Sequence, residues 1–201
     1  DRNQRGLKDG SLLSVVDRTV TGAGARLLKQ RLNSPLINSS EINKRLDSVG
    51  FFIKKNEILK KLRTELRKMG DMARSVSRLG LGRGSPKDIL TLSQGLMLCQ
   101  EIENFFHDVT DLKEIDNVFN AVKKLKISNN SSLFRFALES SEAFLPDAPL
   151  NLRQGGFIAT GWSSELDELK ILRSDSRQHI ANLQAEYIKI SSIPTLKVKH
   201  N

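Results

Sequence analysis

The stretch GSLLSVVDRTVTGAGARLLKQRLNSPL, which runs from Gly10 to Leu36, contains the pattern that decides the fold. Apolar residues at 12, 13, 15 and 16 predict one short helix, and Thr21 is a suitable N-cap for a second. Ser34–Pro35 ends that second helix, because a residue that precedes proline avoids the α-helical region. The stretch holds no metal cluster or phosphate-binding loop, so it predicts helix packing rather than chemistry.

The helical spacing of apolar residues continues through most of the chain. One helix is expected to have Ser39 or Ser40 as its N-cap, and another to have Ser85 as N-cap with Pro86 at its first position. The predicted helices carry apolar residues from Ile42 to Ile53, from Ile58 to Met69, from Met72 to Leu81 and from Ile89 to Phe105, and two more span about Asp111 to Lys126 and Ser131 to Phe144. The fold class is therefore mainly all-α, a multi-helix bundle.

The composition changes at Pro146, where PDAPLNLRQGGFIATGW predicts a loop with a short extended piece near 156–160. Ser164 and Asp167 then resemble a capping box that begins a long helix. If that helix runs from Ser164 to Ile190, it is about 40 Å long and projects from the bundle as a rod.

The last residues, TLKVKHN, alternate in polarity as a β-strand does. A strand needs a partner, and the chain offers none, so we expect a terminal strand that is cut off from its sheet at Asn201. The chain also begins at Asp1 without a methionine, which favours an internal fragment of a longer protein.

The charge balance is strongly basic, with 32 Lys and Arg against 23 Asp and Glu, a formal net charge of +9. Such a balance favours polyanionic partners. The dense basic segment Lys54–Lys68 is best interpreted as a solvated helix face. A second group lies on the predicted rod and beyond it, and these residues are candidates for contact with DNA phosphates: Arg173, Arg177, Lys189, Lys197 and Lys199.

Catalysis by this chain has little support. The three histidines are far apart, the glycine-rich stretches lack the phosphate-loop pattern, and no G-x-S-x-G motif occurs. Cys99 is the only cysteine, so an internal disulfide is excluded. We expect its side chain to pack in the core. No apolar run is long enough to span a bilayer. We therefore assign no catalytic, cofactor-binding or metal-binding residue and expect no membrane partner.

Four stretches, in order, resemble the MutS family of DNA mismatch-recognition ATPases: GSLLSVVDRTVTGAGARLLKQRLNSPL, INKRLDSVGFF, GDMARSVSRLGLGRGSPKDIL, and GGFIATGWSSELDELKIL followed by NLQAEYIKISSIPTLKVKHN. The sequence departs from the family at three places. Trp162 replaces a usual Tyr, Met72–Ala73 replaces Leu-Glu, and Lys199–His200 replaces the Gly-Tyr common before Asn in the clamp. The resemblance spans nearly the whole chain.

The resemblance implies three parts: a helical core or lever domain over 1–149, a connection and the start of the lever helix over 150–172, and a truncated DNA clamp over 173–201. It implies a full-length DNA-dependent ATPase that uses ATP and Mg, encloses double-stranded mismatched DNA as a homodimer, works with a MutL-type repair partner and lies in the bacterial cytoplasm. The fragment itself would neither recognise a mismatch nor hydrolyse ATP.

Two other hypotheses remain. The chain is the lever of a MutS paralogue that acts on branched DNA or stalled ribosomes, or it is a basic helical scaffold for protein interactions. A Phe-x-Glu motif upstream and a G-x-x-x-x-G-K-[ST] motif downstream would establish the mismatch-repair ATPase. Failure of the intact protein to bind DNA at low salt would favour the scaffold.

Overall fold

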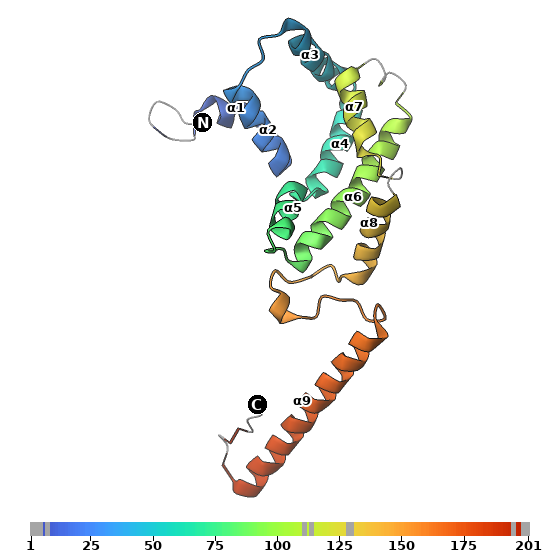
Figure 1. The fold of residues 1–201 in the computed structure, drawn as a ribbon. Helices are drawn as coiled ribbons and strands as arrows, with labels where there is room; N and C mark the ends of the chain where they lie inside the picture. Colours follow the sequence, from blue (N-terminus) through green and yellow to red (C-terminus); the bar gives the residue numbers. More distant parts are fainter. Residues whose placement is uncertain are drawn as a thin grey trace. The chain divides into compact units, whose positions relative to one another are not determined.

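A computed structural model of the chain describes residues 6, 9–109, 112, 115–127, 131–193 and 196–197, the side chains of Ser131 and Arg177 excepted. The chain forms two compact units, Asp1–Phe157 and Ile158–Asn201. Over the described ranges both units are built from helices, without a β-strand, which confirms the predicted all-α class. Figure 1 shows the helices in chain order, from blue to red.

The first unit contains eight α-helices and a short 3-10 helix within its described residues. The helices are α1 (Leu12–Val16), α2 (Gly22–Asn33), α3 (Ser39–Lys54), α4 (Asn56–Lys68), α5 (Met72–Gly80), α6 (Pro86–His107), α7 (Asp116–Leu125) and α8 (Ser131–Ala143), followed by the 3-10 helix η2 (Leu152–Gln154).

The opening stretch forms the two predicted helices, and Thr21 is the N-cap of the second as predicted. Ser11 caps α1, and the Thr21 hydroxyl accepts a hydrogen bond from the Gly24 N–H at 3.0 Å to cap α2. Helix α2 ends at Asn33, just before Ser34–Pro35. These local signals act within three or four residues of chain, which is why the sequence alone locates both helices.

Two predicted helix starts in the first unit are wrong in position. The N-cap of α3 is Asn38, whose side-chain oxygen accepts from the Glu41 N–H at 3.1 Å, so Ser39 and Ser40 lie inside the helix. Helix α7 begins at Asp116 rather than near Asp111. Before it, the Leu112 N–H donates to the Val109 carbonyl and the Ile115 N–H to the Leu112 carbonyl, a spacing of tight turns rather than of an α-helix.

Helix α6 is the centre of the first unit, and α4, α5, α7 and α8 all pack against it (Figure 1). Its residues Leu98, Ile102 and Phe106 recur every four positions and are buried together on one face. Phe51 of α3 and Val118 of α7 complete the same cluster with Leu112. Burial of each large side chain contributes about 1.5–3 kcal/mol, so this cluster holds α3, α4, α6 and α7 together.

Two small residues let neighbouring helices approach α6 closely. Gly95 is buried, and a Cβ atom there would overlap the Met72 sulfur of α5. Ser93 is also buried, and its hydroxyl donates to the Ala137 carbonyl of α8 at 2.6 Å. The two contacts place α5 and α8 against α6 at the end where that helix begins.

The second unit is dominated by α9 (Ser164–Ser191), a helix of 28 residues. The prediction of one long helix here is confirmed, and at 1.5 Å per residue the helix is about 40 Å long. The predicted cap is wrong by one residue, because the hydroxyl of Ser163, not of Ser164, accepts from the Leu166 N–H. Ser192 ends the helix in the left-handed conformation, with φ 55°.

The predicted extended piece near 156–160 is tied to the end of α8. The Leu145 N–H donates to the Phe157 carbonyl at 2.9 Å, and the rings of Phe144 and Phe157 stack with centroids 6.0 Å apart. The predicted terminal strand lies outside the described residues except for Leu196 and Lys197. Across the described part of the chain, no helix has both the length and the apolar character needed to cross a bilayer.

Candidate nucleic-acid interface and helix junctions

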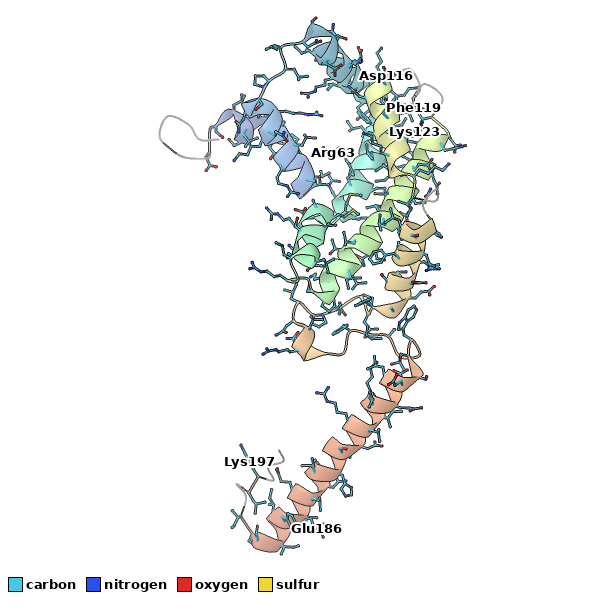
Figure 2. All side chains as sticks on the ribbon, viewed as in Figure 1. Arg63, Asp116, Phe119, Lys123, Glu186 and Lys197 are labelled. Atoms are coloured by element: carbon cyan, nitrogen blue, oxygen red, sulfur yellow. The ribbon has the colours of Figure 1, made fainter. Side chains whose placement is uncertain are left out.

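The five candidate DNA contacts belong to the second unit. Arg173 and Lys189 are exposed on α9, and Lys197, labelled in Figure 2, is exposed after the helix. Arg177 lies within α9, but its side chain is outside the described atoms, and Lys199 is outside the described residues altogether. Where the structure describes these side chains, no ion pair joins Arg173, Lys189 or Lys197 to a carboxylate.

The helix does not gather the candidates into one patch. Arg173 and Arg177 are one turn apart and share a face, whereas Lys189 is about 24 Å further along the axis and about 160° around it from Arg173. Lys189 lies in the last turn of α9, and Lys197 follows the helix. Arg173 lies in the first half of the helix, so the described candidates are spread along it rather than grouped at its end.

The basic segment Lys54–Lys68 behaves as a solvated helix face. Lys60 pairs with Glu57 at 2.8 Å, and Lys68 pairs with Glu65 at 2.6 Å. The ammonium group of Lys61 lies over the Phe105 ring, 4.1 Å from its centroid. These basic side chains thus interact with carboxylates of α4 itself and with an aromatic ring of α6, which supports the interpretation made from the sequence.

A buried carboxylate joins α5 to α6, and the sequence pattern alone did not predict its role. Asp88 is 4% exposed. Its Oδ2 accepts from the Ser85 N–H at 3.0 Å and from the Ser85 hydroxyl at 2.8 Å, while its own N–H donates to the Ser85 hydroxyl oxygen. This is a reciprocal capping box with Asp in place of Glu. The pattern Ser-x-x-Asp after Gly84 is the signal that could have revealed it.

The other oxygen of Asp88 holds α5 in place. Oδ1 accepts from the Ser75 hydroxyl at 2.9 Å, from Arg78 Nε at 3.0 Å and from Arg78 Nη2. The Arg78 guanidinium, followed by the Ser85 and Ser75 hydroxyls, holds the pKa of Asp88 well below its usual range despite the opposing effect of burial. The Asp88 carboxyl group is therefore ionised at every pH above strong acid.

A second ion pair connects α2 to the start of α5. Arg26 Nη1 lies 2.6 Å from Asp71 Oδ2, and Arg26 Nη2 lies 2.8 Å from Oδ1, a bidentate arrangement. Asp71 also caps α5 through the Arg74 N–H at 3.3 Å. The Arg26 guanidinium lowers the pKa of Asp71 to about 2. The contact joins the opening stretch to the third of the four stretches that carry the family resemblance.

Chemical groups for catalysis are not assembled in the described residues. No three His, Cys, Asp or Glu side chains there lie close enough to hold a metal ion. Cys99 lines a partly open pocket of about 660 Å³ whose walls come mostly from α3, α4, α6 and α7, and burial raises the pKa of its thiol. A raised pKa disfavours the reactive thiolate, so Cys99 has the properties of a packing residue.

Comparison with known proteins agrees with the resemblance found in the sequence. A family model described as MutS domain III matches residues 1–193. The DNA mismatch repair protein MutS of Bartonella tribocorum is 41% identical over 200 residues, which are 100% of this chain and 21% of that protein. The protein of the same name from Bartonella quintana is 42% identical over the same shares.

The chain thus spans about a fifth of the length of these curated relatives. The match covers the bundle, the loop after α8 and the whole of α9, so the buried junctions and the long helix belong to the shared region. On the extent of the match and the level of identity, this chain belongs to the MutS family, within its domain III.

Proposed function

We propose that this chain is the core segment of a DNA mismatch-repair ATPase, in which α9 links a helical body to a DNA clamp. The observation that carries the proposal is the match of residues 1–193 to MutS domain III, together with relatives named as mismatch repair proteins. The +9 net charge agrees with a nucleic-acid partner. The same relatives favour the repair protein over a paralogue with another substrate.

The proposed protein has three parts along this chain. Residues 1–149 form the core or lever body, 150–172 connect it to the lever helix, and 173–201 begin the clamp. In the intact protein, ATP and Mg bind in another domain, a second copy completes a dimer around double-stranded DNA, and a MutL-type protein receives the signal. The intact protein works in the bacterial cytoplasm.

The mechanism assigned to this chain is mechanical and electrostatic. A continuous helix of 28 residues transmits a tilt at its base to its tip without unfolding. Exposed cations on α9 and after it hold the DNA backbone without reading its sequence. For such transmission to be allosteric, ATP and DNA must each favour a different state of the protein, and the effect of each on the other is then reciprocal.

The proposed phosphate contacts are tested by the salt dependence of DNA binding. We expect that changing Arg173, Lys189 and Lys197 together to Gln in the intact protein lowers the slope of log affinity against log salt by about 0.9 for each phosphate that the variant no longer neutralises. The measurement is equilibrium binding to a duplex over a salt series.

The matched control changes Lys44, Lys60 and Lys68 to Gln, which removes the same charge from exposed, ion-paired positions of the body. It should leave the slope unchanged. An equal slope for the Arg173, Lys189 and Lys197 variant and the original protein would remove these residues from the interface. The same series with Arg177 and Lys199 changed to Gln tests the two remaining candidates.

A further inference from the structure

The segment Ile158–Gly161 is fastened to the base of α9 by two charged side chains. Lys170 Nζ donates to the Ile158 carbonyl at 3.1 Å, and the Gly161 N–H donates to Asp167 Oδ2 at 2.6 Å. Lys170 Nζ also lies 3.2 Å from Asp167 Oδ1, so the two side chains support each other. We call Ile158, Gly161, Asp167 and Lys170 the clasp.

The geometry of the clasp is specific rather than a surface charge effect. Gly161 has a φ of 89°, a conformation that favours glycine and directs its N–H to the carboxylate. The Asp167 side chain is only 20% exposed, and the Gly161 N–H, more than Lys170, lowers its pKa. An acidic residue in the first turns of a helix ordinarily serves the helix dipole. Here both oxygens of the Asp167 carboxylate also accept hydrogen bonds, one from Lys170 within the helix and one from the Gly161 N–H outside it.

The clasp begins where the first unit ends. Phe157 is held by the Leu145 N–H and by ring stacking on Phe144, both within the first unit. The next residue, Ile158, is held by Lys170 within the second unit. Adjacent residues are therefore held by contacts that lie within different units.

We propose that Asp167 and Lys170 are positioning residues, which make the clasp and α9 one rigid piece. Movement of the chain at Phe157 is then passed to α9 as a whole and is not absorbed by a loose loop. Without the clasp, residues 158–162 would be a flexible connection that decouples the helix from the body. This inference rests on the proposed function of α9 as a transmitter, and it names the side chains that make transmission possible.

The test uses the intact protein and measures duplex affinity with and without ATP. The variant Lys170→Met keeps the aliphatic stem but removes the ammonium group, and Asp167→Ala removes the acceptor of the Gly161 N–H. We expect each variant to reduce the ATP-induced ratio of affinities about fivefold or more, within the usual range of allosteric coupling. Affinity without ATP and the KM for ATP should remain unchanged, which also reports that the variant has folded.

Two further variants make the result specific to the clasp. Lys170→Arg keeps a cation that can donate to the Ile158 carbonyl and should restore most of the coupling. Glu168→Ala removes a neighbouring, exposed acidic side chain and should behave as the original protein. Hydrogen exchange at the Gly161 amide should accelerate in Asp167→Ala and not in Glu168→Ala, because only Asp167 accepts from it.

The possible failures are distinguishable. If the Gly161 amide exchanges faster in Asp167→Ala but the ATP-induced ratio stays at its original value, the clasp has no positioning role and the proposed function stands. If the original protein shows no change of DNA affinity with ATP, both the proposed function and the positioning role are wrong. If Lys170→Arg loses as much coupling as Lys170→Met, the cation is not acting through the Ile158 carbonyl, and the proposal is overturned.

Discussion

Replacing Asp88 with alanine is expected to lower the free energy of unfolding of this chain by about 2–4 kcal/mol. The change removes the capping box of α6 and leaves the Ser85 N–H and the Ser75 hydroxyl without their acceptor at a buried position. It also leaves Arg78 without its carboxylate. Because α5 contacts α6 through this network and through Met72 on Gly95, both helices should loosen together.

Urea unfolding followed by circular dichroism measures this destabilisation. The matched control is Asp147→Ala, which removes an exposed carboxylate and should shift the midpoint little. Equal midpoints for Asp88→Ala and Asp147→Ala would contradict the account of the junction.

The same carboxylate has a predictable pH dependence. Its pKa is lowered in the folded state, so its stabilising effect is fully present above the unfolded pKa of about 3.9 and decreases as the pH falls below that value. The difference in unfolding free energy between the original chain and Asp88→Asn should therefore be constant from pH 7 to about pH 5 and shrink towards pH 3. A difference that grows in acid would mean that the folded pKa is raised.

Replacing Ala181 with proline in the intact protein is expected to abolish most of the effect of ATP on DNA affinity. Ala181 is an exposed residue in the interior of α9, so its side chain itself has no packing role in the described unit. Proline there removes one main-chain hydrogen bond and clashes with the preceding turn, at a cost of about 3 kcal/mol or more. The resulting kink would let the two halves of the helix move separately.

The control Ala181→Gln places a good helix former at the same exposed position and should leave the coupling intact. Duplex affinity with and without ATP is the measurement, and ATP hydrolysis in the absence of DNA should be equal in all three proteins. Full coupling in Ala181→Pro would show that α9 is not the transmitter, whatever the role of the clasp.

Local signals explain why so much of the fold follows from the sequence. Thr21 caps α2, Ser85 and Pro86 begin α6, and the apolar spacing after Ser164 predicts α9, all within a few residues of chain. The errors also have local causes. Asn38 and Ser39, like Ser163 and Ser164, are adjacent residues with equally suitable side chains, and spacing alone does not choose between them.

The junctions could not be predicted in this way, because their partners are distant in sequence. Arg26 reaches Asp71 across 45 positions, and Ser75 reaches Asp88 across 13. Neither spacing corresponds to a helical or strand period. The clasp is hidden from sequence patterns for a related reason: the Asp167 carboxylate, which suggested a capping box, instead accepts from the backbone of Gly161 outside the helix. The five candidate cations remain predictions until binding is measured.

The most direct test of the central claim is the affinity of the intact protein for a mismatched duplex and for the same duplex fully paired, each with and without ATP. A mismatch-repair ATPase whose core segment is this chain should bind the mismatched duplex more tightly, and ATP should change that affinity. Equal affinity for the two duplexes with a clear ATP response would identify a paralogue with another substrate. No duplex binding at low salt, with or without ATP, would contradict the account and leave a basic helical scaffold.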